Sequence, residues 1–194
     1  MASGPVEVTR RAGVVTLTLD TPGSEVNILS NQAADQILAA LDGVRPDNTR
    51  VVVLTTAKDE SFINGVGLMM AIAATSPESA QALTTRIRAA YDAVGACPVP
   101  TVAAIRGNCY GCGIEFSLRC DHRLAADTAS THFYMTELND YLFNPVFEGT
   151  LRLPLLLGLG PAADLLLWGE RWSARQARVR GLVDRVVGAD EFDA

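Results

Sequence analysis

The sequence predicts a single α/β domain, and its length, its composition and the order of its segments all point that way. The chain has 194 residues, of which 48% are hydrophobic and 20% charged. A domain of this size buries about 70% of its unfolded surface, so the chain can form a substantial core. Strand-like segments alternate with helix-like segments throughout, which favours mostly parallel strands joined by helical crossovers. No internal repeat or linker divides the sequence, so residues 1–194 are predicted to form one domain.

The first half of the chain supplies two strands and two helices. Residues 14–19 (VVTLTL) are rich in β-branched residues and precede a turn signal, DTPG, which predicts a strand. Ser30 is a predicted helix N-cap, followed by apolar residues at helical spacing. Residues 50–56 predict a buried strand. Ser76 followed by Pro77 predicts the start of the second helix, because proline favours the first helical position.

The second half continues the alternation. Strands are predicted at 101–105, 122–126 and 182–187, and irregular structure at 127–149. Helices are predicted at 114–118, at 161–168, in the Leu-rich stretch from 151, and at 175–180. Ser173 is the predicted cap of this last helix, and Gly181 its end. Trp168 and Trp172, on either side of a turn, are expected to pack in the core.

Charge and hydropathy exclude several classes of protein. Against 16 Lys and Arg stand 22 Asp and Glu, a net charge of −6, whereas nucleic acids and anionic membranes attract basic proteins. No apolar run reaches the ~20 residues of a membrane span, because Gly158, Gly160 and Pro161 interrupt the Leu-rich stretch. The N-terminus lacks the basic-then-apolar pattern of a signal peptide, so a cytoplasmic location is expected.

The four cysteines do not resemble a disulfide framework. Cys109 and Cys112 have the spacing of half a zinc site, but Cys97 and Cys120 lie at irregular distances from them and no second close pair exists. Buried free thiols behave as small hydrophobic groups. The sequence therefore predicts no metal site and no cofactor.

Two segments share one local design, a strand followed by a glycine-containing turn and then a helix. The turns are 62–67 and 107–113. Such turns direct backbone N–H groups outward at the positive end of a helix, where they bind anions. Neither turn matches a nucleotide-binding fingerprint. Two turns that donate to one point would make an oxyanion hole, although the spacing alone is equally satisfied by glycines that only relieve crowding between strand and helix.

Six segments, in the same order along the chain, resemble motifs of the enoyl-CoA hydratase/isomerase (crotonase) superfamily. Residues 62–68 (FINGVGL) are similar to its Phe-x-Ala-Gly-x-Asp-Leu segment, and residues 105–121 (IRGNCYGCGIEFSLRCD) to its triple-glycine segment ending in Cys-Asp. The remaining four matches are 25–29 (EVNIL), 133–137 (FYMTE), 150–158 (TLRLPLLLG) and 173–183 (SARQARVRGLV). Together they cover nearly the whole chain.

The resemblance implies a crotonase-like ββα spiral core and a function in fatty acid metabolism. Members bind acyl thioesters, usually of coenzyme A, and stabilise an enolate. By position, the backbone N–H groups of Val66 and Cys112 would form the oxyanion hole, and Glu115 and Glu137 would be the catalytic acid/base pair. The implied substrate-binding residues are Val26, Ile28, Asn64, Gly65, Gly67, Leu68, Tyr110 and Gly111.

Hydration of a 2-enoyl thioester, or the reverse dehydration of a 3-hydroxyacyl thioester, is the leading interpretation because both glutamates are kept. One carboxylate activates water and one carboxyl group protonates Cα. An alternative is a decarboxylase or dehydratase of a polyketide pathway that acts on carrier-protein thioesters, since residues 141–145 (YLFNP) loosely resemble an aromatic segment there. A third is a catalytically silent binding subunit, favoured by Cys112 in place of a family glycine and by bulky residues at 146–148.

The sequence ends before the helical tail that the family pattern would place after residue 194. Apolar surface that such a tail would cover is then expected to be exposed, and large apolar patches usually mark interfaces. We therefore expect either a homo-oligomer, a trimer or hexamer, or a piece of a longer polypeptide.

Overall fold

The computed structural model describes residues 4–66 and 76–193. Its larger sheet has six strands in the order β1-β2-β3-β5-β7-β10. They are β1 (Val6–Arg11), β2 (Val14–Leu19), β3 (Val51–Thr56), β5 (Thr101–Ile105), β7 (His122–Ala126) and β10 (Arg185–Val187). β1 and β2 form an antiparallel hairpin, and the other neighbours pair in parallel, as predicted.

A second, four-stranded sheet has the order β4-β6-β8-β9. It consists of β4 (Ser61–Ile63), β6 (Asn108–Tyr110), β8 (His132–Tyr134) and β9 (Trp172–Ser173). The chain runs three times from the larger sheet into the smaller one before it enters a helix. The strand pairs are β3/β4, β5/β6 and β7/β8, the first strand of each pair in the larger sheet and the second in the smaller one. This is the predicted ββα spiral.

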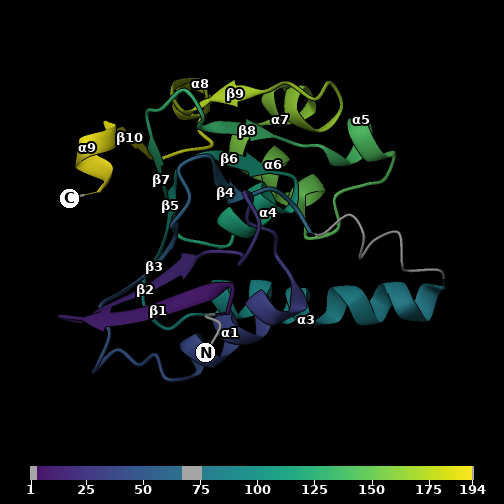
Figure 1. Ribbon diagram of the computed structural model, residues 1–194. Coiled ribbons are helices and arrows are strands. Elements are labelled where there is room, and N and C mark those ends of the chain that lie inside the picture. The colour runs from purple at the N-terminus through teal and green to yellow at the C-terminus, as the bar shows by residue number, and fades with distance from the viewer. Residues whose placement is uncertain (1–3, 67–75, 194) are drawn as a thin grey trace.

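Helices surround the two sheets (Figure 1). α1 (Asn31–Asp42) and α3 (Pro77–Gly95) lie side by side below, and α4 (Cys112–Ser117), α6 (Gly149–Leu157) and α7 (Leu159–Leu166) lie with the smaller sheet above. The shorter helices are α5 (Glu137–Tyr141), α8 (Ala174–Val179) and α9 (Ala189–Phe192). Ser30, Ser76 and Ser173 each cap the helix predicted for them, the last two in capping boxes.

Several sequence predictions were wrong in detail. β1 went unpredicted because only Val6 of its six residues is buried, so it has no apolar alternation to detect. The segments 107–113 and 127–149 contain β6, β8 and α5, which are too short for a periodic pattern. The last strand covers only Arg185–Val187. Trp168 is 74% exposed rather than packed, whereas Trp172 is buried as expected.

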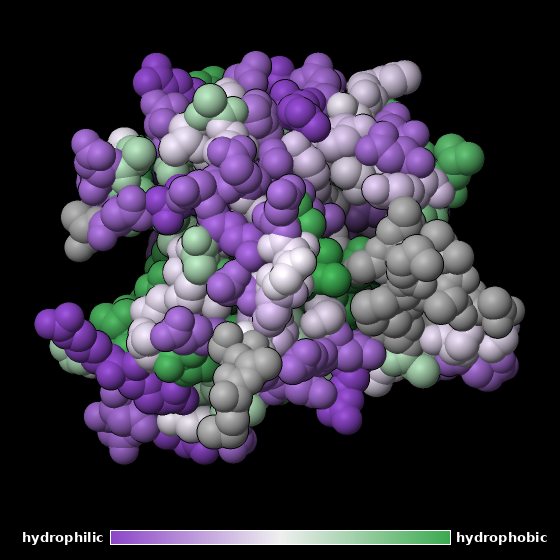
Figure 2. Space-filling model, in the orientation of Figure 1, coloured by the Kyte–Doolittle hydropathy of each residue, from purple (hydrophilic) through white to green (hydrophobic). Residues whose placement is uncertain are grey.

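The core is continuous and aromatic-rich around the helices that carry the candidate site. Tyr91, Phe116 and Phe147 are all fully buried and contact one another through the Tyr91 ring. Hydrophilic residues dominate the face shown in Figure 2, and hydrophobic ones come into view as smaller patches in the middle of the molecule and on its left side. Within the described ranges, no helix is both long and apolar enough to cross a membrane.

Candidate active site

The two glycine-containing turns and the start of α5 enclose one cavity of about 220 Å³. Its lining residues come from four separate stretches of the chain. They are Ile28, Asn64, Gly65, Val66, Cys112, Thr136, Glu137, Tyr141, Phe143 and Val146. The fold thus brings six of the predicted site residues to one place.

The first turn follows β4 and is held by the segment around Asn27. The Asn64 N–H donates to the Asn27 carbonyl at 2.8 Å, and the Leu29 N–H donates to the Gly65 carbonyl at 3.0 Å. The buried Asn27 amide in turn donates to Thr56 Oγ1 at 2.9 Å. Gly65 has φ +105°, which an L side chain rarely adopts. These bonds fix the direction of the backbone that leads to Val66.

The second turn joins β6 to α4 and lies against the first. Gly111 has φ +51°, and its N–H donates to the Tyr134 carbonyl at 2.8 Å. A Cβ atom at Gly113 would lie 2.4 Å from the Ile63 carbonyl oxygen. Glycine at position 113 therefore lets the start of α4 approach the end of β4, which brings the two turns to one cavity.

Val66 and Cys112, whose backbone amides are the predicted oxyanion-hole donors, both line this cavity. Neither N–H has a hydrogen-bond acceptor among residues 4–66 and 76–193. Cys112 is the first residue of α4, where an amide has no partner within the helix. Both groups are thus free to donate to a ligand oxygen, and the oxyanion hole stays a prediction.

Glu137, the first residue of α5, supplies a carboxyl group to the cavity wall. It is 5% exposed, and its Oε2 has no hydrogen-bond partner in the described chain. Burial, with a further contribution from the charge of Glu115, raises the pKa of Glu137 to about 7. Near neutral pH this carboxyl group therefore exists in both protonation states.

Glu115 lies on α4, behind the cavity wall and fully buried. Its Oε1 accepts hydrogen bonds from the backbone N–H groups of Phe147, at 2.9 Å, and Gly149, at 2.7 Å, while Oε2 has no partner in the described part of the chain. Burial raises the pKa of Glu115, and these two hydrogen bonds act against that rise. These two hydrogen bonds favour the ionised form of the Glu115 carboxyl group.

A buried polar atom without a partner is uncommon and calls for an explanation. In the described part of the chain both glutamates have one, and burial raises the pKa of both carboxyl groups. Such a pair is typical of acid/base sites.

The Cys112 side chain occupies the position of a family glycine. It is 3% exposed, and burial followed by the charges of Glu115 and Glu137 raises the pKa of this thiol well above its usual value. Cys112 is therefore a neutral thiol here. Its side chain adds bulk to the cavity wall without adding charge.

Other predicted site residues lie elsewhere or outside the described ranges. Val26 and Gly111 do not line the cavity, although a Cβ atom at Gly111 would lie 2.4 Å from Glu137 Oε1. Tyr110 instead packs edge-on against Tyr134. Gly67 and Leu68 lie outside the described residues.

The site residues not predicted from sequence are Thr136, Tyr141, Phe143 and Val146. Thr136 directly precedes Glu137 in the sequence, so its position beside a predicted site residue could have indicated it. Tyr141 and Phe143 stack with ring centroids 6.1 Å apart at the cavity mouth, and their spacing in the YLFNP segment was the signal there.

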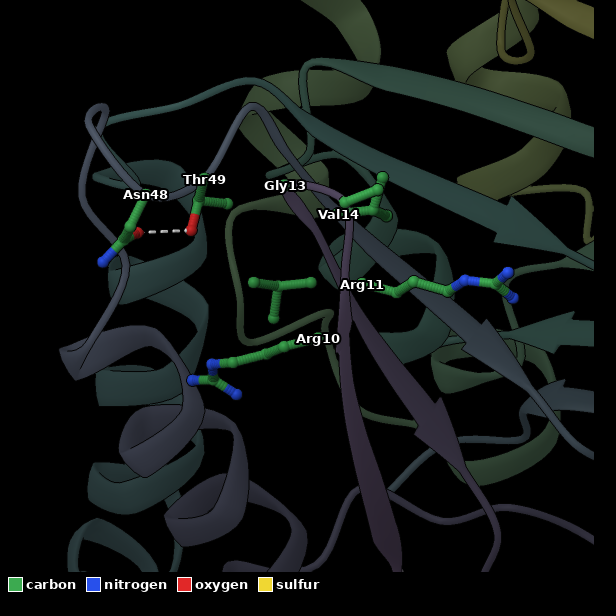
Figure 3. Close-up of a pocket in the computed structure, with 8 residues that line it drawn as sticks. Arg10, Arg11, Gly13, Val14, Asn48 and Thr49 are labelled. Carbon is green, nitrogen blue, oxygen red and sulfur yellow. Dashed lines mark hydrogen bonds between the residues drawn. The ribbon is translucent and has the colours of Figure 1, made fainter.

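A second cavity, of about 240 Å³, lies beside the β1–β2 hairpin (Figure 3). Arg10 and Arg11 line it, but Figure 3 shows their side chains pointing to opposite sides. Arg10 Nη2 donates to the Ala40 carbonyl near the end of α1, at 2.8 Å. This arginine stabilises a helix end, and no convergent polar group makes the cavity a site.

Among the described residues, no cluster of three or more His, Cys, Asp and Glu could hold a metal ion. All four cysteines are free thiols.

A ββα spiral in which two glycine turns and the carboxyl group of Glu137 line one cavity, with the buried Glu115 outside that lining, defines the crotonase class of fold. A family model described as enoyl-CoA hydratase/isomerase matches residues 9–194, and the chain belongs to that family.

Individual relatives agree with this assignment. The chain is 36% identical over 179 residues to the fatty acid oxidation complex subunit alpha of Shewanella amazonensis, covering 92% of this chain and 25% of that protein. It thus spans about a quarter of the length of this curated relative. The solved structure of an enoyl-CoA hydratase from Bacillus anthracis superposes with a TM-score of 0.88 at 33% identity, covering 98% of this chain and 72% of the other. DspI of Pseudomonas aeruginosa has the same TM-score at 26% identity, covering 98% and 76%.

Proposed function

We propose that the chain catalyses the reversible hydration of a 2-enoyl thioester. The observation that carries this proposal is the pair of buried glutamates, Glu137 on the cavity wall and Glu115 outside the lining. Val66 and Cys112 line the same cavity, and their backbone N–H groups have no acceptor within the described ranges. Relatives named enoyl-CoA hydratase and fatty acid oxidation complex subunit alpha support coenzyme A as the thiol.

In the proposed reaction, the thioester oxygen accepts hydrogen bonds from the amides of Val66 and Cys112. This withdraws electrons from Cβ and stabilises the enolate that forms when Cβ is attacked. The Glu115 carboxylate takes one proton from water as the water oxygen bonds to Cβ. The Glu137 carboxyl group gives its proton to Cα, so the elements of one water molecule add across the double bond.

The direct test is an activity screen with matched 2-enoyl thioesters of coenzyme A and of an acyl carrier protein. We expect loss of the enoyl absorbance with coenzyme A thioesters. Conversion of only the carrier-protein thioesters would favour the polyketide alternative, and the same screen should include a 2-carboxyacyl thioester to detect decarboxylation. Binding without conversion of any thioester would favour the silent subunit.

The pH profile of kcat/KM should fall on its alkaline side above about 7. The proposed acid, Glu137, must hold its proton in the free enzyme, and its pKa is raised to about 7. Ionisation above that pH removes the proton donor. A profile that stays flat to pH 9 would contradict this assignment, and Glu137→Asp is the control in which the alkaline limb should move but persist.

We also propose that the exposed leucines of α6 and α7 mediate self-association into a trimer or hexamer. Leu151 is 58% exposed, Leu155 78% and Leu159 81%. Large exposed apolar patches are uncommon on monomers and often mark interfaces, and these leucines follow one another at four-residue intervals. Sedimentation velocity tests this, and a stable monomer would count against it.

A further inference from the structure

The turn that binds Glu115 has an unusual residue at its centre. Glu148 lies between the two donors, Phe147 and Gly149, and has φ +72° and ψ +12°. Few L residues other than Asn and Asp adopt this left-handed conformation, because Cβ crowds the backbone. Something in the surroundings must therefore hold Glu148 in place.

The conformation matters because it sets the direction of both donors. With Glu148 left-handed, the N–H groups before and after it converge on the same oxygen, Glu115 Oε1. Gly149 packs closely against the Glu115 carboxylate: a Cβ atom at position 149 would lie 2.9 Å from Glu115 Oε1. A change in the backbone at position 148 would therefore move at least one donor away from Glu115.

Four side chains contact the Glu148 carboxylate, and they come from α3, from α6 and from the segment after α4. Arg152 Nε donates to its Oε2 at 2.8 Å, and the Tyr91 hydroxyl to the same oxygen at 3.3 Å. Arg88 Nη1 lies 3.7 Å from Oε1, and Arg119 Nη1 lies 3.9 Å from Oε2. Burial alone would raise the pKa of Glu148, but the hydrogen bonds and charges of Arg152, Tyr91 and Arg119 together outweigh burial and lower the pKa.

These partners also hold the rest of the turn. Arg88 Nη2 donates to the Val146 carbonyl, and its guanidinium lies 5.3 Å from the centre of the Phe147 ring. The Arg119 guanidinium lies 4.9 Å from the centre of the Tyr91 ring, and Asp92 is its second acidic neighbour, at 3.9 Å. Among the described residues, the carboxylate of Glu148 is the only acidic group that contacts Arg88, Arg119 and Arg152 together. Tyr91 also contacts all three arginines.

We propose that Glu148 is a positioning residue, whose carboxylate, held by Arg88, Arg119, Arg152 and Tyr91, fixes the 147–149 turn so that its two amides orient Glu115 and keep it ionised. The proposal rests on the proposed function in that Glu115 is the base there. It assigns a role to one of the bulky residues at 146–148.

Removing the Glu148 carboxylate should change the pKa of Glu115. The direction of that change distinguishes a positioning role from a purely electrostatic one. The titratable and charged groups that act on Glu115 are Glu137, Cys112 and Arg88. Removing the negative charge of Glu148 leaves Arg88 less neutralised, which by charge alone would lower the pKa of Glu115. Loss of the two backbone hydrogen bonds would raise it. Positioning predicts the rise.

The experiment compares wild type with Glu148→Gln and with the control Glu170→Gln. Glu170 is also paired with an arginine, Arg180, but lies far from Glu115 in the chain and makes no contact with the 147–149 turn. The pKa of Glu115 is measured by carbon-13 NMR titration of its carboxyl group, assigned with Glu115→Gln. We expect it to rise by about one pH unit in Glu148→Gln, and not in the control.

Hydration kinetics give the second measurement. In Glu148→Gln, kcat should fall by roughly 10–100-fold with KM nearly unchanged, since a displaced base slows the step after binding. The acid limb of the kcat profile should move to higher pH. An unchanged or lowered pKa of Glu115 in a folded variant would overturn the proposal.

Folding and function are controlled separately. If circular dichroism shows Glu148→Gln to be unfolded, Arg152→Gln removes the shortest of the four contacts and should raise the pKa of Glu115 in the same direction. If wild type hydrates no thioester, the proposed function fails, and the NMR titration alone still decides the positioning role.

Discussion

Replacing either Glu115 or Glu137 with glutamine is expected to slow hydration by roughly 10²–10⁴-fold, with little change in substrate binding. Glutamine keeps the shape of glutamate, but its amide neither accepts nor releases a proton near neutral pH. At position 115 its amide oxygen can still accept from Phe147 and Gly149, so the turn should stay in place. The loss should therefore appear in kcat rather than in stability.

The double variant should lose much less than the product of the two single losses. Both groups act on the same water molecule in one reaction step. Once either is removed, removal of the other causes little further loss of rate. The measurement is a double-mutant cycle on hydration of a 2-enoyl-CoA, with circular dichroism and thermal unfolding as controls of the fold. Glu170→Gln makes the same substitution at an exposed glutamate paired with Arg180, so it is the matched control and should keep wild-type turnover.

Each outcome separates the interpretations. Full activity in either folded single variant would contradict the hydratase assignment while leaving the family membership intact. A decarboxylase needs no activated water, so one glutamine variant would then stay nearly active on a 2-carboxyacyl thioester.

Local signals predicted much of the fold. Serine caps at 30, 76 and 173 marked three helix starts, because a serine side chain followed by helix-compatible residues satisfies an otherwise unpaired N–H. The short strands β6 and β8 could not be predicted, since three residues show no period. They exist because the parallel pairing of distant segments stabilises them.

Part of the candidate site was likewise predictable from local sequence, and part depends on tertiary packing. Glu115 and Glu137 were predicted from motif positions, but their different environments were not. Glu115 receives its hydrogen bonds from residues 32 and 34 positions away, and its stabilisation depends on a left-handed backbone at Glu148. Such geometry follows from tertiary packing, which local sequence patterns do not report.

Gly113→Ala is expected to damage both stability and catalysis, because position 113 is where α4 meets β4. The added Cβ would lie 2.4 Å from the Ile63 carbonyl oxygen and 2.9 Å from Ile63 Cβ, so backbone has to move. Overpacking of this kind costs about 1–3 kcal/mol of unfolding free energy.

The same displacement should separate the amides of Val66 and Cys112, which lie just beyond the contact on either side. A shift of about 1 Å in a catalytic group can cost about 100-fold in rate, so kcat/KM should fall by about that factor. Urea unfolding and hydration kinetics measure the two effects. Gly160→Ala is the matched control: it lies in α7 with no atom within 4 Å of the added Cβ, and alanine there should leave activity unchanged. Equal behaviour of the two variants would mean that the contact between the turns does not set the geometry of the site.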